Sequence, residues 1–137
     1  MRRSAQREGG PVTMRRAVAA VALLAAGCAT ETIPPDVPKS VREFAIAPYE
    51  IHEECADMAV GDRLDYRFEA QAPVAFHLYY REGLAFVSPV SRDGTQAFGG
   101  VFVATADRRY CLQWEAGQQG ALLDYSLRLL RLSLIHI

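Results

Sequence analysis

The chain has 137 residues, half of them hydrophobic, and its 15 basic and 16 acidic residues give a formal net charge of −1. Residues 1–28 contain five arginines and one glutamate, a net charge of +4, so the rest of the chain carries −5. A domain this acidic has no electrostatic footprint for nucleic acid, and its length favours a single domain.

The N-terminal residues have the composition of a secretory signal peptide. Arg15 and Arg16 provide a positive start, and residues 17–27 form an apolar run that is shorter than the roughly 20 residues of a membrane-spanning helix. A buried core helix is the alternative, but Ala and Val dominate the run and it has no polar face. Residues 1–13 are polar and Arg-rich, so we expect translation to start at Met14.

The run ends in Leu24-Ala25-Ala26-Gly27-Cys28, which resembles the lipobox of bacterial lipoproteins. The resemblance implies a signal peptide over residues 1–28 and a lipid on Cys28, which becomes the first residue of the mature protein. Lipoboxes usually carry Leu where this chain has Ala25. Because Ala29 rather than Asp follows the cysteine, the resemblance further implies sorting to the outer membrane of a bacterial cell envelope, facing the periplasm.

The mature chain would then contain two further cysteines, Cys55 and Cys111. An even pair in an oxidising compartment favours a disulfide, which would stabilise the fold by roughly 4 kcal/mol. A free thiol nucleophile and a metal-binding pair are the alternatives. His52 and Cys55 give an H-x-x-C spacing, but no second ligand accompanies Cys111 at a zinc spacing, and we expect no metal site.

Residues 29–44 have the composition of a flexible linker. Pro34, Pro35 and Pro38 are interspersed with short polar residues, and Pro-rich segments are extended, at about 3.1 Å per residue. We therefore expect this segment to hold the domain clear of the membrane, and we expect the folded domain over residues 45–132.

From residue 45 onward the sequence has the period-2 alternation of β-strands. Residues 64–70 alternate apolar and charged side chains after a turn at Gly61 and Asp62, and residues 74–81 form a second strand. Turns are expected at residues 82–83 and 92–94, and further strands over residues 84–90, 101–104, 109–115 and 122–130. The series contains no convincing helix and predicts an all-β domain, an antiparallel, jelly-roll-like β-sandwich of about seven or eight strands.

Five sequence blocks resemble two related β-domains, the GOLD-type domain and the prepeptidase C-terminal β-sandwich. The blocks are Cys55, V-G-D-R-L-D-Y-R-F-E-A from residue 60, P-V-A-F-H-L from residue 73, G-V-F-V-A from residue 100 and Y-C-L-Q-W from residue 110. The GOLD resemblance implies that Cys55 and Cys111 pair. It does not imply the transport role of the GOLD cargo receptors, because architecture does not specify function.

The sequence contains no G-x-S-x-G, H-E-x-x-H, EF-hand or phosphate-binding glycine motif. Asp57, Asp62 and Asp65 lack the loop spacing of a calcium site. The densest polar cluster is expected to be a solvated strand end; it comprises Glu50, His52, Glu53 and Glu54. We therefore expect no catalytic residue, no cofactor and no concave pocket that contains Glu53 or His52.

His77, Tyr79 and Phe102 are candidates for an exposed aromatic binding patch, because exposed aromatic residues mark interaction sites. Their burial under loops or under the second sheet is the alternative. Residues 133–137 look like translated adapter sequence, and we expect them to be non-native. If they are native, they would extend the final strand as an exposed apolar edge.

Two functions from different classes fit these features. The first is a membrane-anchored envelope lipoprotein whose non-enzymatic β-sandwich binds an envelope protein or a glycan, or serves as a structural subunit of a larger assembly. The alternative is a small envelope hydrolase that uses residues 50–54. An enzyme needs a concave pocket with convergent polar groups, so the shape of the surface around these residues discriminates between the two functions.

Overall fold

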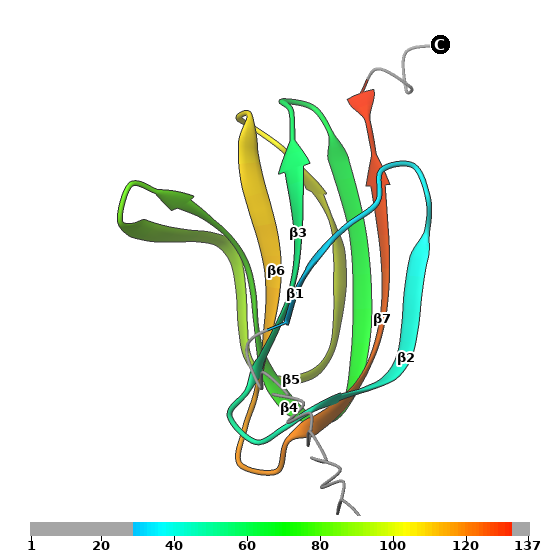
Figure 1. The fold of residues 1–137 in the computed structure, drawn as a ribbon. Helices are drawn as coiled ribbons and strands as arrows, with labels where there is room; N and C mark the ends of the chain where they lie inside the picture. Colours follow the sequence, from blue (N-terminus) through cyan, green and yellow to red (C-terminus); the bar gives the residue numbers. More distant parts are fainter. Residues whose placement is uncertain (1–28, 133–137) are drawn as a thin grey trace, which may run out of the picture.

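The computed structural model describes residues 29–132, which form seven β-strands (Figure 1). The strands are β1 (Ala29–Thr32), β2 (Lys39–Ile46), β3 (Ile51–Met58), β4 (Arg63–Glu82), β5 (Ala85–Val103), β6 (Arg108–Ala116) and β7 (Ala121–Leu130). Their order in the sheet is β1-β3-β6-β4-β7-β2, and β5 pairs with β4. Neighbouring strands are antiparallel except for β1 and β3, which are parallel. The predicted all-β sandwich is confirmed.

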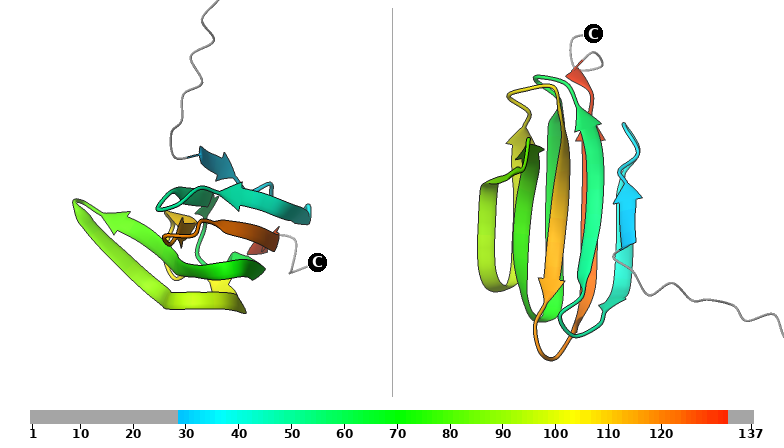
Figure 2. Two further views of the ribbon diagram at one scale, coloured as in Figure 1. Left: turned by 90° about the horizontal axis from the view of Figure 1, so that it is seen from below. Right: turned by 60° about the vertical axis from the view of Figure 1, so that its left-hand side comes forward.

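Two long strands, β4 and β5, take part in both halves of a curled sheet. Residues 63–70 of β4 pair with β7, whereas residues 74–79 of the same strand pair with β6. The ladder between β4 and β5 is irregular between Glu69 and Val74, where Pro73 lacks a backbone N–H to donate. The sheet bends at this point, and its two halves face one another across the core (Figure 2).

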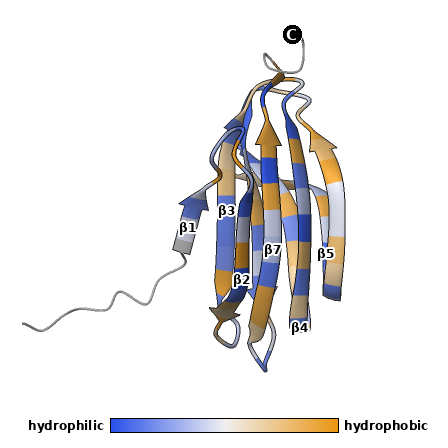
Figure 3. Ribbon diagram, turned by 90° about the vertical axis from the view of Figure 1, so that its right-hand side faces the viewer, coloured by the Kyte–Doolittle hydropathy of each residue, from blue (hydrophilic) through white to orange (hydrophobic). Residues whose placement is uncertain are grey.

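The core lies between the two halves and is centred on aromatic side chains. Trp114 of β6 is fully buried, with ring centroids 5.9 Å from Phe68, 5.7 Å from Phe76 and 5.0 Å from Tyr125. These rings come from β4, β6 and β7, so the contacts join both halves. Along β4 and β7 hydrophobic and hydrophilic residues alternate, as Figure 3 shows. Each fully buried large side chain contributes about 1.5–3 kcal/mol.

The structure joins four of the predicted strands into two. The strands predicted over residues 64–70 and 74–81 are the two halves of β4, and those predicted over residues 84–90 and 101–104 are the two ends of β5. The turn predicted at residues 92–94 is wrong, because this segment belongs to β5. Its polar residues are tolerated because β5 pairs with β4 alone and is exposed on its other edge.

The predicted linker over residues 29–44 is also wrong for the described residues. It contains β1 and most of β2, and the side chain of Ile33 between them is only 2% exposed. The backbone N–H of Ile33 donates a 2.9 Å hydrogen bond to Cys55 O. The prolines lie between the two strands, where the missing N–H costs no ladder hydrogen bond. The domain therefore begins at β1 instead of residue 45.

Several predictions concern residues outside the described range. The signal peptide, the start at Met14, the lipid on Cys28 and the tail at residues 133–137 all lie there and stay predictions. Within residues 29–132, no helix is long and apolar enough to cross a membrane.

Candidate functional site

Strand β3 divides the predicted acidic cluster between two faces of the sheet. His52 and Glu54 face the core and are buried, with Glu54 0% exposed, while Glu53 faces outward and Glu50 is exposed just before the strand. The prediction of a solvated strand end is therefore wrong for His52 and Glu54. They are buried because the strand alternates its side chains and because partners from β2 and β7 donate hydrogen bonds to one oxygen of the Glu54 carboxylate.

The interior cluster consists of Lys39, His52, Glu54 and Tyr125. Glu54 Oε1 accepts hydrogen bonds from Lys39 Nζ at 2.6 Å and from the Tyr125 hydroxyl at 2.7 Å. His52 Nε2 lies 3.0 Å from the Tyr125 hydroxyl oxygen. Because the single hydroxyl hydrogen of Tyr125 is directed to Glu54, His52 Nε2 must carry the hydrogen of this second bond. Lys39 also pairs with Glu31 of β1.

The cluster keeps Glu54 charged. Burial alone would raise the pKa of Glu54, but the polar contact with His52 and the hydrogen bonds from Lys39 and Tyr125, together with the charge of Lys39, lower that pKa to about 2. Burial and the neighbouring Glu54 carboxylate raise the pKa of Tyr125, which stays protonated. The network joins β2, β3 and β7.

This cluster does not form a catalytic site. His52, Glu54 and Tyr125 are all buried, so a substrate cannot reach them from solvent. Their geometry resembles an acid–base relay, but a general acid or base must contact the proton that it transfers. The cluster therefore ties strands of both halves together, and the hydrolase that uses residues 50–54 loses two of its candidate residues.

The outward face of β3 and β6 carries the disulfide between Cys55 and Cys111. The two residues lie directly opposite one another in the ladder, with their Cα atoms 4.1 Å apart and an S–S bond of 2.05 Å. The predicted disulfide is confirmed. It links two neighbouring strands and lies beside Tyr79 of β4.

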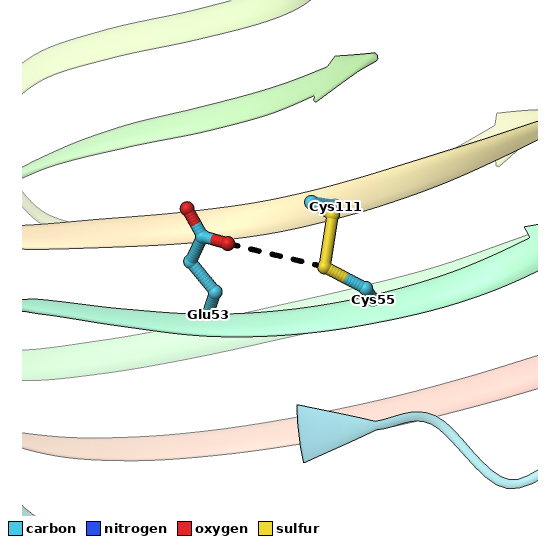
Figure 4. A group of neighbouring side chains, drawn as sticks. All are labelled: Glu53, Cys55 and Cys111. Carbon is cyan, nitrogen blue, oxygen red and sulfur yellow. Dashed lines mark hydrogen bonds between the residues drawn. A yellow bond between two sulfur atoms is a disulfide. The ribbon is translucent and has the colours of Figure 1, made fainter. Parts of the chain in front are cut away.

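Glu53 is held next to the disulfide by two neutral donors. Its Oε1 accepts hydrogen bonds from the Tyr79 hydroxyl and from Gln113 Nε2, each at 2.7 Å. The dashed line in Figure 4 joins Glu53 Oε2 to Cys55 Sγ, 4.0 Å away. Neither sulfur of a disulfide carries a hydrogen, so this is a contact without a donor.

Glu53, Cys55 and Cys111 also have the composition of a metal-ligand set. Their ligand atoms lie within 4.8 Å of one another. Zinc, however, is bound by the thiolate form of cysteine, and both sulfurs here are committed to the S–S bond. As long as the disulfide is intact, the trio holds no more than one ligand for an ion.

An open groove of about 600 Å³ runs over the disulfide. Cys55, Cys111 and Tyr79 line it together with Glu53, and three arginines do so as well: Arg81, Arg108 and Arg109. The prediction of no concave pocket around Glu53 is therefore wrong. Burial is the main cause that raises the pKa of Tyr79 to about 12, and the hydrogen bond to Glu53 is the second. The Tyr79 hydroxyl therefore stays protonated. Neither the Tyr79 hydroxyl nor the two disulfide sulfurs is an activated nucleophile.

The predicted aromatic patch is only partly assembled. His77 and Tyr79 lie on the outward face, where both contact Phe86 of β5 with ring centroids 6.2 Å and 4.2 Å away, respectively. Tyr79 is nevertheless buried, with 5% of its surface exposed, so the predicted exposure is wrong for this residue. Phe102 instead packs against the core, with its ring centroid 5.0 Å from that of Tyr110. It faces inward because it pairs with Leu64, a core residue of β4. The predicted patch of His77, Tyr79 and Phe102 is therefore wrong. Phe86, and not Phe102, contacts the other two rings.

Sequence analysis missed Phe86 although the sequence carried a signal for it. The turn expected at residues 82–83 makes a hairpin and places the first residues of β5 opposite the last residues of β4. Phe86 consequently pairs with Arg81, within reach of Tyr79. Leu84 at the tip is fully exposed, and Phe86 is 46% exposed. We call residues 80–88 the β4–β5 hairpin; it extends beyond the neighbouring strands in Figure 1.

No known protein family matches the sequence, and no curated protein does so either. Solved structures do share the fold. PliG from Aeromonas hydrophila, a periplasmic lysozyme inhibitor of g-type lysozyme, has a TM-score of 0.56 at 11% identity; the match covers 73% of this chain and 95% of PliG. The prepeptidase C-terminal domain of a Bacillus anthracis collagenase has a TM-score of 0.54 at 11% identity and is matched over 75% of this chain and 96% of its own.

At this identity the likeness concerns the fold alone. It confirms the resemblance to the prepeptidase C-terminal sandwich at the level of architecture, whereas the likeness to GOLD-type domains stays a prediction.

Proposed function

We propose that this chain is a lipid-anchored protein of the bacterial cell envelope whose β-sandwich is a non-enzymatic, protein-binding domain. The observation that carries the proposal is the pair of exposed hydrophobic side chains, Leu84 and Phe86, on the β4–β5 hairpin. Leu84 is fully exposed at its tip, and about half of Phe86 is exposed beside the groove. Exposed hydrophobic clusters of this kind mark interaction surfaces.

The hairpin is suited to binding because its aromatic side chains are already ordered. Phe86 stacks on Tyr79 with their ring planes 23° apart, and Glu53 fixes the Tyr79 hydroxyl. Burying a large side chain contributes about 1.5–3 kcal/mol, and an ordered one loses little conformational entropy on binding. Arg108 lies over the Tyr80 ring at 4.2 Å and braces the base of the hairpin.

Three observations support a location in the cell envelope. The signal-peptide composition and the lipobox resemblance place the proposed lipid on Cys28. The disulfide between Cys55 and Cys111 suits an oxidising compartment. One structural neighbour, PliG, is described as periplasmic. The outer membrane, facing the periplasm, is the location that we propose.

The function is tested by replacing Leu84 with a photo-crosslinking amino acid in intact cells. Val101 is the control, because it is an exposed apolar residue of β5 that does not line the groove. We expect position 84 to form adducts with an envelope protein and position 101 to form none. Adducts that are identical at both positions, or their complete absence at position 84, would contradict the proposal. Because one structural neighbour is a lysozyme inhibitor, g-type lysozyme is the first purified protein to test for binding.

A further inference from the structure

The position at which the chain enters the sandwich determines where a lipid anchor would hold it. Ala29, the first described residue, pairs with His52, one residue after the start of β3. Cys28 precedes Ala29 directly, so their Cα atoms lie about 3.8 Å apart. Because β1 begins at Ala29, no linker separates Cys28 from the sandwich. A lipid on Cys28 would therefore hold the domain itself close to the membrane.

The two turns at the nearest end of the sandwich, residues 47–50 and 117–120, carry one charged side chain, Glu50. We call residues 46–49, 71–73 and 117–122 the neutral end; none of these residues is charged, although 23% of the whole chain is. The three segments come together in space, because two adjoining shallow depressions are lined by residues from all of them. The backbone N–H of Tyr49 donates a 3.2 Å hydrogen bond to Gly117 O and joins two of the segments. In Figure 1 this end lies at the bottom.

The opposite end of the sandwich differs in charge. The connection between β3 and β4 and the start of β4 carry Asp62 and Arg63, and the connection between β5 and β6 carries Asp107. Arg131, just after β7, pairs with Asp62 at 3.3 Å. Charge is thus sparser at the neutral end, whose two turns carry Glu50 as their single charged residue.

Tyr49 is the most conspicuous residue of the neutral end. It is 67% exposed, and its φ of 61° is in the left-handed region, which costs free energy for a residue other than glycine. Glycine at position 49 would avoid this cost, so the presence of the exposed tyrosine lowers the stability of the fold. Tyr is an amphipathic residue that is enriched at the headgroup level of membranes. Leu122 adds a partly exposed aliphatic side chain to the same end.

We propose that the neutral end rests on the headgroup layer of the membrane that holds the lipid of Cys28, with Tyr49 as the main contact. This inference rests on the proposed lipid anchor. Residues 29–137 carry a net charge of −5, and anionic headgroups repel acidic surfaces, so the domain approaches the membrane most favourably with its uncharged end. Glu50 adjoins Tyr49, and Glu69, Glu115 and Asp124 each lie two residues from the neutral end along the chain. These acidic residues mark the boundary of the contact.

The same orientation directs the partner-binding hairpin away from the lipid. Arg108, which lies over Tyr80 at the base of the hairpin, pairs with Met58 at the last residue of β3. Ala29, in contrast, pairs near the first residue of β3. The anchor and the hairpin base therefore lie toward opposite ends of this strand, which leaves the hairpin accessible from the periplasm.

The orientation is tested with tryptophan reporters on vesicles of phosphatidylethanolamine and phosphatidylglycerol that contain brominated acyl chains. Tyr49→Trp reports on the neutral end, and Val60→Trp, an exposed position between β3 and β4, is the matched control. Trp114 is buried and gives the same background in both variants. We expect the Tyr49→Trp emission to shift to the blue and to be quenched by the brominated lipid, and the Val60→Trp emission to do neither.

The lipid is supplied in two ways so that failure of the anchor and failure of the orientation can be distinguished. The first sample is the protein extracted from cell membranes, with fatty-acid labelling of Cys28 as a direct readout of the anchor. In the second, the chain from Cys28 onward is joined to a maleimide phospholipid through Cys28, the only thiol left when Cys55 and Cys111 are paired. An unlabelled Cys28 overturns the anchor alone. Equal quenching at both positions, or stronger quenching at position 60, on the chemically anchored chain overturns the orientation.

Discussion

The hydroxyl of Tyr125 donates a 2.7 Å hydrogen bond to the buried carboxylate of Glu54, although the two residues are 71 positions apart in the chain. Tyr125 belongs to β7 in one half of the sheet, and Glu54 belongs to β3 in the other. Lys39 adds a charge from β2 to the same carboxylate oxygen. A single buried carboxylate thus connects β3 of one half to β2 and β7, which pair with each other in the other half.

Replacing Lys39 with Met should destabilise the fold. The carboxylate of Glu54 would stay buried without its cation, and breaking a buried ion pair costs about 3–5 kcal/mol. Because Lys39 keeps part of its side chain in solvent, we expect about 2–3 kcal/mol, measured by urea unfolding. Arg67→Met is the control, since Arg67 and Glu69 form an exposed pair at 3.6 Å, and it should leave the free energy of unfolding nearly unchanged. If both variants lose the same free energy of unfolding, the Lys39–Glu54 pair stabilises the fold no more than the exposed pair does.

The stability of the domain should fall at acidic pH because of Glu54. Its pKa is about 2 in the folded protein against 4.5 in the reference state, so the unfolded chain binds the proton first. The contribution is fully present above pH 4.5 and is lost as the pH falls from 4.5 through 2, by about 3 kcal/mol. Denaturant midpoints measured across this range check it. Glu54→Gln removes the titrating group and should flatten the curve there; an unchanged slope would exclude Glu54 as its source.

The same cluster shows what sequence could and could not predict. Alternation along residues 64–70 and 74–81 identified the faces of β4, and compartment arguments identified the Cys55–Cys111 pair, because both depend on local pattern or composition. The burial of Glu54 depends on Lys39 and Tyr125, which only the tertiary fold brings to it. Charged residues are usually solvated, and this general rule fails where distant strands supply the partners.

The predicted start of the domain at residue 45 was wrong for a related reason. Prolines at positions 34, 35 and 38 gave the segment the composition of a linker. Composition does not reveal that Ile33 finds a place in the core, nor that β1 adds to the edge of β3. The predicted aromatic patch was wrong for Phe102 because the bend of β4 and β5 determines which face of β5 is covered. No local sequence pattern specifies that bend.

Removing the disulfide should cost a large share of the stability. Cys55→Ser combined with Cys111→Ser removes both thiols of the pair, and loss of the cross-link should lower the free energy of unfolding by roughly 4 kcal/mol. Chemical denaturation of this variant beside the oxidised wild type measures the difference. In the native, non-reduced protein neither cysteine should react with maleimide. Reaction of both thiols would show that the pair is not formed.

The turn between β6 and β7 should depend on glycine at position 120. Gly120 has a φ of +67°, and a Cβ there would lie 2.8 Å from Ile46 O, a backbone atom of the neutral end. Gly94 has a similar φ of +59°, but a Cβ would meet no atom within 4 Å. Gly94→Ala should therefore cost only the backbone strain, about 1 kcal/mol, whereas Gly120→Ala adds a steric clash and should cost at least about 2 kcal/mol. Thermal unfolding of the two variants separates strain from clash, and equal losses would mean that the packing of the β6–β7 turn against Ile46 is looser than the structure shows.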